Sequence, residues 1–139
     1  MASFVKFNSF VEALAEKVHN LGSDQLKIAL TNTDPTASAT NYAGLTSPLP
    51  TTNLSGATPF NVTTSSSSQT GGTYKLVCAD LTLTATGAVG PFRYVVLYND
   101  TAAADELIGY WDYGSSISLA NGETFTVDFD ASNGVLKLA

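Results

Sequence analysis

The stretch FRYVVLYN, residues 92–99, is apolar on both sides of an extended chain. Successive side chains of a strand point to opposite sides, and a strand that is apolar on both is buried on both. One side carries Val95 and Leu97, and the other carries Phe92, Tyr94, Val96 and Tyr98. The stretch therefore predicts a central core strand, with its second side covered by another element such as an N-terminal helix.

From residue 74 onward, short apolar runs alternate with turns. In residues 74–86, YKLVCADLTLTAT, the odd positions from Val77 to Ala85 are apolar, which predicts one strand of a sandwich. Further runs occupy residues 106–114, 116–120, 124–129 and 135–138. Asn-Gly pairs at 121–122 and 133–134 predict hairpins between neighbouring runs. The pattern predicts a mainly β fold, an antiparallel β-sandwich or jelly roll with a β-rich core at 74–139, or a barrel.

One helix is predicted near the start, over residues 8–21. Its apolar positions recur every three or four residues, which is typical of one buried stripe; they are Phe7, Phe10, Val11, Leu14, Val18 and Leu21. Ser9 and Glu12 form a capping-box pattern, His19 suits the negative end of the helix dipole as a partly exposed side chain, and Gly22 can end the helix. A strand is predicted to follow in residues 24–32, DQLKIALTN.

Residues 33–73 are rich in Ser, Thr, Pro, Asn and Gly and predict a long loop or extended arm. So long a segment is either held by something or mobile, and it leaves room for one or two irregular strands. Residues 63–73, TTSSSSQTGGT, are predicted to be its most flexible part. Isolated apolar side chains interrupt the segment, and we expect the chief ones to bury against a partner molecule: Tyr42, Leu45, Leu49, Leu54 and Phe60.

Composition disfavours most functional classes. The 139 residues can build one core, and we expect a single jelly-roll-like domain over 1–139. The formal net charge of −6 disfavours nucleic acid and anionic membranes as partners. One Cys and one His provide no disulfide framework or Cys/His metal cluster, and Cys78 is expected to be a buried small hydrophobe. Charged residues interrupt the first 18 residues, so no signal peptide is expected.

Several chemical readings of the polar residues are weak. His19 could serve as the base of a triad, and Asp112 with Asp128 or Asp130 could form the carboxyl pair of a glycosidase. The stretch DFDASNG, residues 128–134, resembles a calcium loop only faintly, because its glycine comes one place late and Ala139 occupies the position of the bidentate glutamate. We therefore expect no catalytic, metal or cofactor site and no enzymatic activity.

The aromatic cluster of residues 110–113 is the sharpest alternative to a structural role. Aromatic faces beside a carboxylate would suit a sugar-binding module. Alternation, however, places Trp111 and Tyr113 on one side of a strand and Tyr110 on the other. Core packing of Trp111 is therefore favoured over a flat sugar platform.

Three blocks of the sequence together carry a family resemblance. They are FVKFNSFVEALAEKVHNLGSDQLKIALTN at 4–32, GPFRYVVLYND at 90–100 and LIGYWDYGSSISLANGETFTVDFDASNGVLKLA at 107–139. With these blocks the chain resembles small virion proteins of tailed bacteriophages. The resemblance implies a jelly-roll-like cement or decoration protein, made in the host cytoplasm and bound to the outside of the head.

The same resemblance implies partners rather than a reaction. The implied partners are the major capsid protein, with the shell fold common to tailed phages, and further copies of the chain as a dimer or trimer. An arm that bridges capsid subunits would suit this role, and the apolar side chains of residues 33–73 would then bury against capsid or a sister copy. A tail, collar or fibre-attachment component of the virion, or a module that binds host-surface carbohydrate, remains the alternative.

Overall fold

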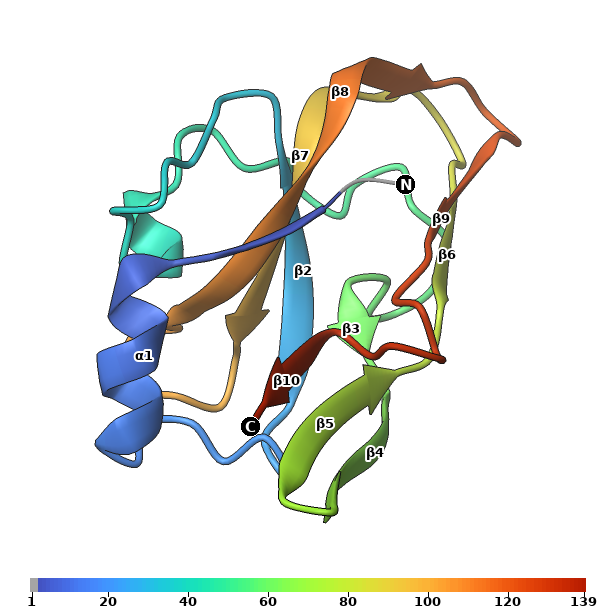
Figure 1. Cartoon of the computed structure of the whole chain (residues 1–139). Helices are drawn as coiled ribbons and strands as arrows, with labels where there is room; N and C mark the ends of the chain where they lie inside the picture. The colour runs from blue at the N-terminus through green and yellow to red at the C-terminus, as the bar shows by residue number, and fades with distance from the viewer. Residues whose placement is uncertain (1–2) are drawn as a thin grey trace.

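A computed structural model describes residues 3–139 and confirms a mainly β fold, with 46% strand and 8% helix. The described residues form one α-helix, one short 3₁₀ helix and ten strands, in chain order β1 (Phe4–Lys6), α1 (Asn8–Ala15), β2 (Leu26–Thr31), η1 (Tyr42–Gly44), β3 (Asn61–Val62), β4 (Thr64–Thr70), β5 (Thr73–Cys78), β6 (Leu81–Thr84), β7 (Val89–Asn99), β8 (Leu107–Leu119), β9 (Thr124–Val127) and β10 (Leu136–Leu138). Figure 1 shows α1 beside the strands, with β6 and β9 on the opposite side of the molecule.

The strands form three antiparallel sheets in a sandwich-like arrangement. The largest has the order β1-β8-β7-β2-β3, and the others are β10-β5-β4 and β6-β9. The main core cluster contains side chains from all three sheets and from α1. The small sheets and the helix therefore cover one side of the large sheet.

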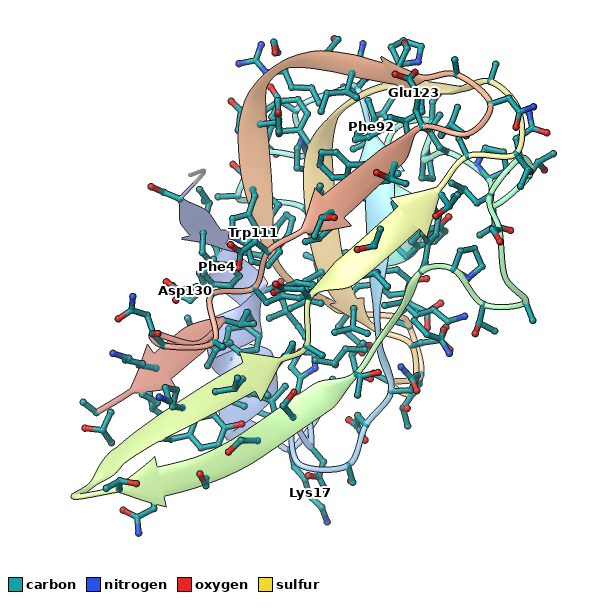
Figure 2. All side chains as sticks on the ribbon, turned by 90° about the vertical axis from the view of Figure 1, so that its right-hand side faces the viewer. Phe4, Lys17, Phe92, Trp111, Glu123 and Asp130 are labelled. Atoms are coloured by element: carbon teal, nitrogen blue, oxygen red, sulfur yellow. The ribbon has the colours of Figure 1, made fainter. Side chains whose placement is uncertain are left out.

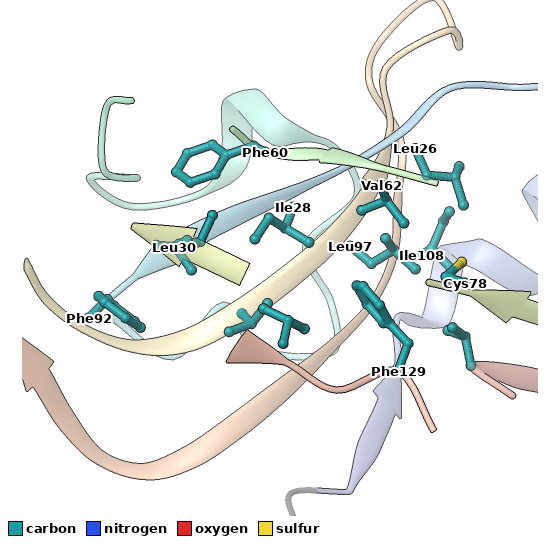
Figure 3. Close-up of a cluster of buried hydrophobic side chains, with 14 of the residues drawn as sticks. Leu26, Ile28, Leu30, Phe60, Val62, Cys78, Phe92, Leu97, Ile108 and Phe129 are labelled. Carbon is teal, nitrogen blue, oxygen red and sulfur yellow. The ribbon is translucent and has the colours of Figure 1, made fainter. Parts of the chain in front are cut away.

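Strand β7 is central, as residues 92–99 predict, but an irregularity changes which side chains share a side. The pairing of β7 with β8 shifts register between Phe92 and Tyr94. Phe92 pairs with Ile117 and Tyr94 pairs with Asp112, so two steps along β7 match five along β8 and the regular alternation is interrupted there. Phe92 therefore packs in the main core with Val95 and Leu97 rather than with Tyr94 and Val96. Figure 3 labels Phe92 and Leu97 in this cluster.

The second side of β7 is covered by the segment around η1, which corrects the expectation that the helix covers it. A smaller cluster on that side joins Val96 and Tyr98 to Leu45 and to the half-buried Tyr42. The rings of Tyr42 and Tyr98 lie 5.0 Å apart. The Phe10 side chain of the helix packs in the main core instead.

The helix ends at Ala15, six residues before the predicted end. Lys17 adopts φ +69°, its amide donates to the Leu14 carbonyl, and the amide of Val18 donates to the Ala13 carbonyl at 2.9 Å. These two bonds form a Schellman motif, with Lys17 in the left-handed position that Gly22 is predicted to fill. The predicted capping box is also wrong, because the N-cap is Phe7 and no side chain caps the helix.

The single strand predicted over residues 74–86 is divided into two strands, β5 and β6. Leu76 and Cys78 are buried before the break, and Leu83 and Ala85 are buried after it.

The two predicted hairpins are wrong in their strand pairing. The chain turns at Gly122, but β9 pairs with β6 rather than with β8. Likewise β10 pairs with β5 and not with β9. These turns carry the chain between sheets instead of closing hairpins.

Residues 33–73 lie against the domain and do not form a free arm. Asn41 bridges to Glu106, and Leu54 bridges to Ala85. The stretch predicted to be the most flexible, residues 63–73, contains β4, which pairs with β5 along its length. The long segment is thus held by the chain's own strands, which is one of the two outcomes that its length allows.

Candidate partner-binding surface

The five side chains predicted to bind a partner all pack within this chain. Leu45, Leu54 and Phe60 are each 8% exposed. Tyr42 and Leu49 are half-buried and pack against the two core clusters. Most of their apolar surface is therefore covered within the chain, and burial of these side chains against capsid or a sister copy stays a prediction.

A different apolar surface stays open beside α1, which we call the helix furrow. It consists of two adjoining hollows of about 350 Å³ and 660 Å³ that share Leu14 and Leu138. The first lies between α1, β1 and β10, and the second between the end of α1, the loop after it and the β4–β5 hairpin. In Figure 2 the helix lies behind β10, β5 and β4, with Phe4 labelled near one end of the helix and Lys17 near the other.

Large apolar side chains are concentrated in this furrow. Five are exposed among the described residues, and three of them, Val11, Val18 and Leu138, line the furrow. Val11 is 53% exposed and Leu138 is 56% exposed. Exposed apolar groups that gather in one place mark an interaction surface, whereas isolated ones need no explanation.

Two of these exposed side chains are ones that the sequence pattern predicts to be buried. Val11 and Val18 belong to the periodic stripe that predicts burial against the core. Because α1 ends at Ala15, Val18 lies on the following turn, and Val11 lies on the side of the helix that faces the furrow. The apolar positions cover more of the helix surface than the core can bury, and this excess could have indicated a second partner for the helix.

Lysines surround the furrow in a chain of net negative charge. Lys6 and Lys137 line the first hollow and Lys17 lines the second. The two ion pairs among the described residues use other cations, Lys27 with Asp100 at 3.4 Å and Arg93 with Asp112 at 2.7 Å. The furrow is therefore locally cationic.

A buried polar network forms the wall of the larger hollow. The Asn99 side-chain oxygen accepts from the amides of Thr101 and Ala102, which fixes the orientation of its amide. Its nitrogen then donates to Asp24 Oδ2 at 2.7 Å and lies 3.0 Å from Nδ1 of His19. Since Nδ1 must accept this bond, His19 is neutral with its proton on Nε2.

His19 is 6% exposed, which corrects the expectation of a partly exposed helix partner. Burial lowers the pKa of His19, and the nearby Glu106 and Asp24 carboxyls only partly oppose this effect. The ring packs on Phe10 at 5.3 Å and binds Asn99 through Nδ1. Through these contacts His19 connects the loop after α1 to the end of β7.

The carboxyls considered for catalysis make structural contacts. Arg93 donates two hydrogen bonds to Asp112, which lower the pKa of that carboxyl. Hydrogen bonds from Asn133 lower the pKa of Asp130. A general acid in a glycosidase needs a raised pKa. The pKa values of Asp112 and Asp130 are both lowered, which does not suit that role.

The stretch DFDASNG is closed by its own hydrogen bonds. Asp128 Oδ1 accepts from the amide of Asp130, and Asp130 accepts from Asn133. Among residues 3–139, no three His, Cys, Asp or Glu side chains gather as a metal site would require. None of the helices in this part of the chain combines the length and apolar character needed to cross a bilayer.

The aromatic side chains of residues 110–113 are divided between two sides of β8, as alternation predicts. Tyr110 packs on Phe7 at 5.2 Å, and Trp111 packs between Phe4 at 5.1 Å and Phe129 at 5.7 Å. Tyr113 is 56% exposed. Core packing of Trp111 on its two neighbours therefore agrees with the favoured interpretation.

Comparison with known proteins adds no relative. No protein-family model, curated protein or solved structure gives a significant match to the chain.

Proposed function

We propose that the chain is a non-enzymatic structural protein of a tailed-phage virion, a cement protein that binds the outer surface of the head and stabilises the shell of major capsid protein. The helix furrow is the observation that carries this proposal. It provides an apolar surface with three exposed large side chains on a small β domain whose other large apolar groups are mostly buried. Such a surface suits attachment to another protein.

The proposed role needs no reaction, because a contact repeated over a symmetric shell can stabilise it. A protein that binds only the assembled state favours that state by mass action. Many weak contacts on one particle add their effects. The five apolar side chains of residues 33–73 pack within the chain, which favours the furrow over the arm as the attachment surface.

Co-sedimentation with heads that lack this protein tests the proposal. We expect saturation at hundreds of copies per head and an increase in the temperature at which the heads release DNA. Binding at about a dozen copies would instead indicate a vertex, collar or tail component, since multivalent coverage of the shell needs many sites. Absence of binding would refute the cement role.

A further inference from the structure

We propose that the helix furrow receives an extended, acidic segment of the shell protein, which pairs as an added strand with the open edge of β10. This inference rests on the proposed function for the identity of the partner, and on the geometry of the furrow for its chemistry. Four features of the chain support it: open strand edges, exposed apolar side chains, local positive charge and the volume of the furrow.

Two open strand edges border the smaller hollow. β1 is the outermost strand of the large sheet and β10 is the outermost strand of its own sheet. Residues of both strands line the hollow, with α1 as the third wall. An unpaired strand edge presents amide and carbonyl groups that can bind another strand. A segment placed here finds backbone partners as well as side-chain contacts.

The side chains of β10 suit such a strand addition. Leu136 and Leu138 lie opposite Leu76 and Tyr74 of β5, so they share a side with this buried or half-buried pair. Leu138 remains 56% exposed at the end of the strand. Main-chain pairing supplies affinity in strand addition, and pockets for alternate side chains supply specificity. Leu138 and Val11 provide the exposed apolar surface for those alternate side chains.

Charge favours an acidic segment. Lys6, Lys17 and Lys137 line the furrow, while Asp24 is the one acidic side chain among the described residues that line it. Asp24 already accepts hydrogen bonds from Asn99 and from the amide of Asn20. The three lysines make no ion pair with a described residue. Complementary charge directs an acidic partner to this side and disfavours a basic one.

The combined volume of the furrow is sufficient for a short chain segment. The hollow beside β10 measures about 350 Å³ and continues into one of about 660 Å³. A segment that follows α1 along both hollows would meet Leu14 and Leu138, which both hollows share. An extended chain spans about 3.3 Å per residue, so a short segment is sufficient.

The test uses three variants of the full chain with undecorated heads. Leu138→Glu places a negative charge on the apolar wall, and Lys137→Glu reverses a rim charge. Tyr113→Glu is the matched control, because Tyr113 and Leu138 are both 56% exposed and Tyr113 lies outside the furrow. We expect head affinity to fall about tenfold or more for the two furrow variants and to stay within about twofold for the control.

A defined peptide probe tests the chemistry without heads. The probe is a blocked hexapeptide that alternates glutamate and valine, and its counterpart alternates lysine and valine. In nuclear magnetic resonance titrations we expect the acidic peptide to shift the amides of β1 and β10 and to slow hydrogen exchange in β10. The basic peptide should leave them unchanged, and salt should weaken the acidic one.

The outcomes separate the two proposals. Heads that bind Leu138→Glu as well as the unchanged protein would overturn the furrow and leave the cement role intact. Peptide binding without head binding would overturn the cement role and keep the acidic-strand site. A dimer that Leu138→Glu dissociates in sedimentation would show that a second copy fills the furrow, which would overturn the shell segment as its occupant.

Discussion

Replacement of Phe60 by alanine tests whether the polar segment of residues 33–73 is part of the core. The Phe60 side chain is 8% exposed and belongs to the main cluster. Its backbone carbonyl accepts a hydrogen bond from the amide of Ile28 at 3.0 Å, and alanine retains that carbonyl. The substitution therefore removes side-chain packing and leaves the backbone contact in place.

The structure sets the expected size of the effect. Truncation of a buried phenylalanine to alanine costs about 3–5 kcal/mol, and the remaining exposure of Phe60 favours the lower end of this range. At about 2.1 cal/mol/K per residue, 139 residues give an unfolding entropy of about 290 cal/mol/K. A loss of about 3 kcal/mol then lowers Tm by about 10 °C.

Thermal unfolding followed by circular dichroism measures this shift, with Tyr113→Ala as the control. Tyr113 is 56% exposed, so its truncation should change the free energy of unfolding by about 0.5 kcal/mol or less. If Phe60→Ala lowered Tm no more than the control, residues 33–73 would not be packed on the core. That result would support a free arm, with its apolar side chains available to a partner.

Three further predictions concern stability and reactivity. Lys17 holds a left-handed φ of +69°, so Lys17→Gly should raise the free energy of unfolding by about 0.5–1 kcal/mol, seen as a higher urea midpoint; a lower midpoint would contradict the Schellman assignment. Burial lowers the pKa of His19 below its ordinary value of 6.5, so the unfolded chain binds more protons than the folded one. Tm should therefore fall as pH decreases below 6.5, and His19→Gln should reduce this dependence of Tm on pH. An equal dependence in both proteins would refute the burial of a neutral His19. Burial raises the pKa of the Cys78 thiol to about 11, so Ellman's reagent at neutral pH should react only after unfolding, and rapid reaction of the native protein would contradict the burial.

Much of the secondary structure could be predicted from the sequence, because the side-chain alternation of a strand is a local property. The apolar runs at residues 92–99 and 124–129 show their strands without knowledge of any partner. The burial of Cys78 follows in the same way from its apolar neighbours, and the structure places it at 1% exposure.

Other features depend on contacts between distant parts of the chain. Turn residues at Asn121 and Asn133 determine where the chain turns, but the strands that pair are separated by long stretches of sequence. The irregularity near Phe92 exists only in the pairing of β7 with β8. Isolated apolar residues such as Leu54 and Phe60 could serve the core or a partner equally well, and only the folded chain decides between the two.

The candidate surface shows the same division. The sequence by itself determined the apolar strands at residues 92–99 and 124–129, the acidic net charge and the presence of an amphipathic helix, because each depends on the residues of a short stretch or on composition. Tertiary structure alone decided that α1 stops at Ala15 and that β1 and β10 remain unpaired on one side. The furrow beside Val11 and Leu138 arises where these three elements meet, and burial of a side chain is a property of the whole packed chain rather than of its neighbours in sequence.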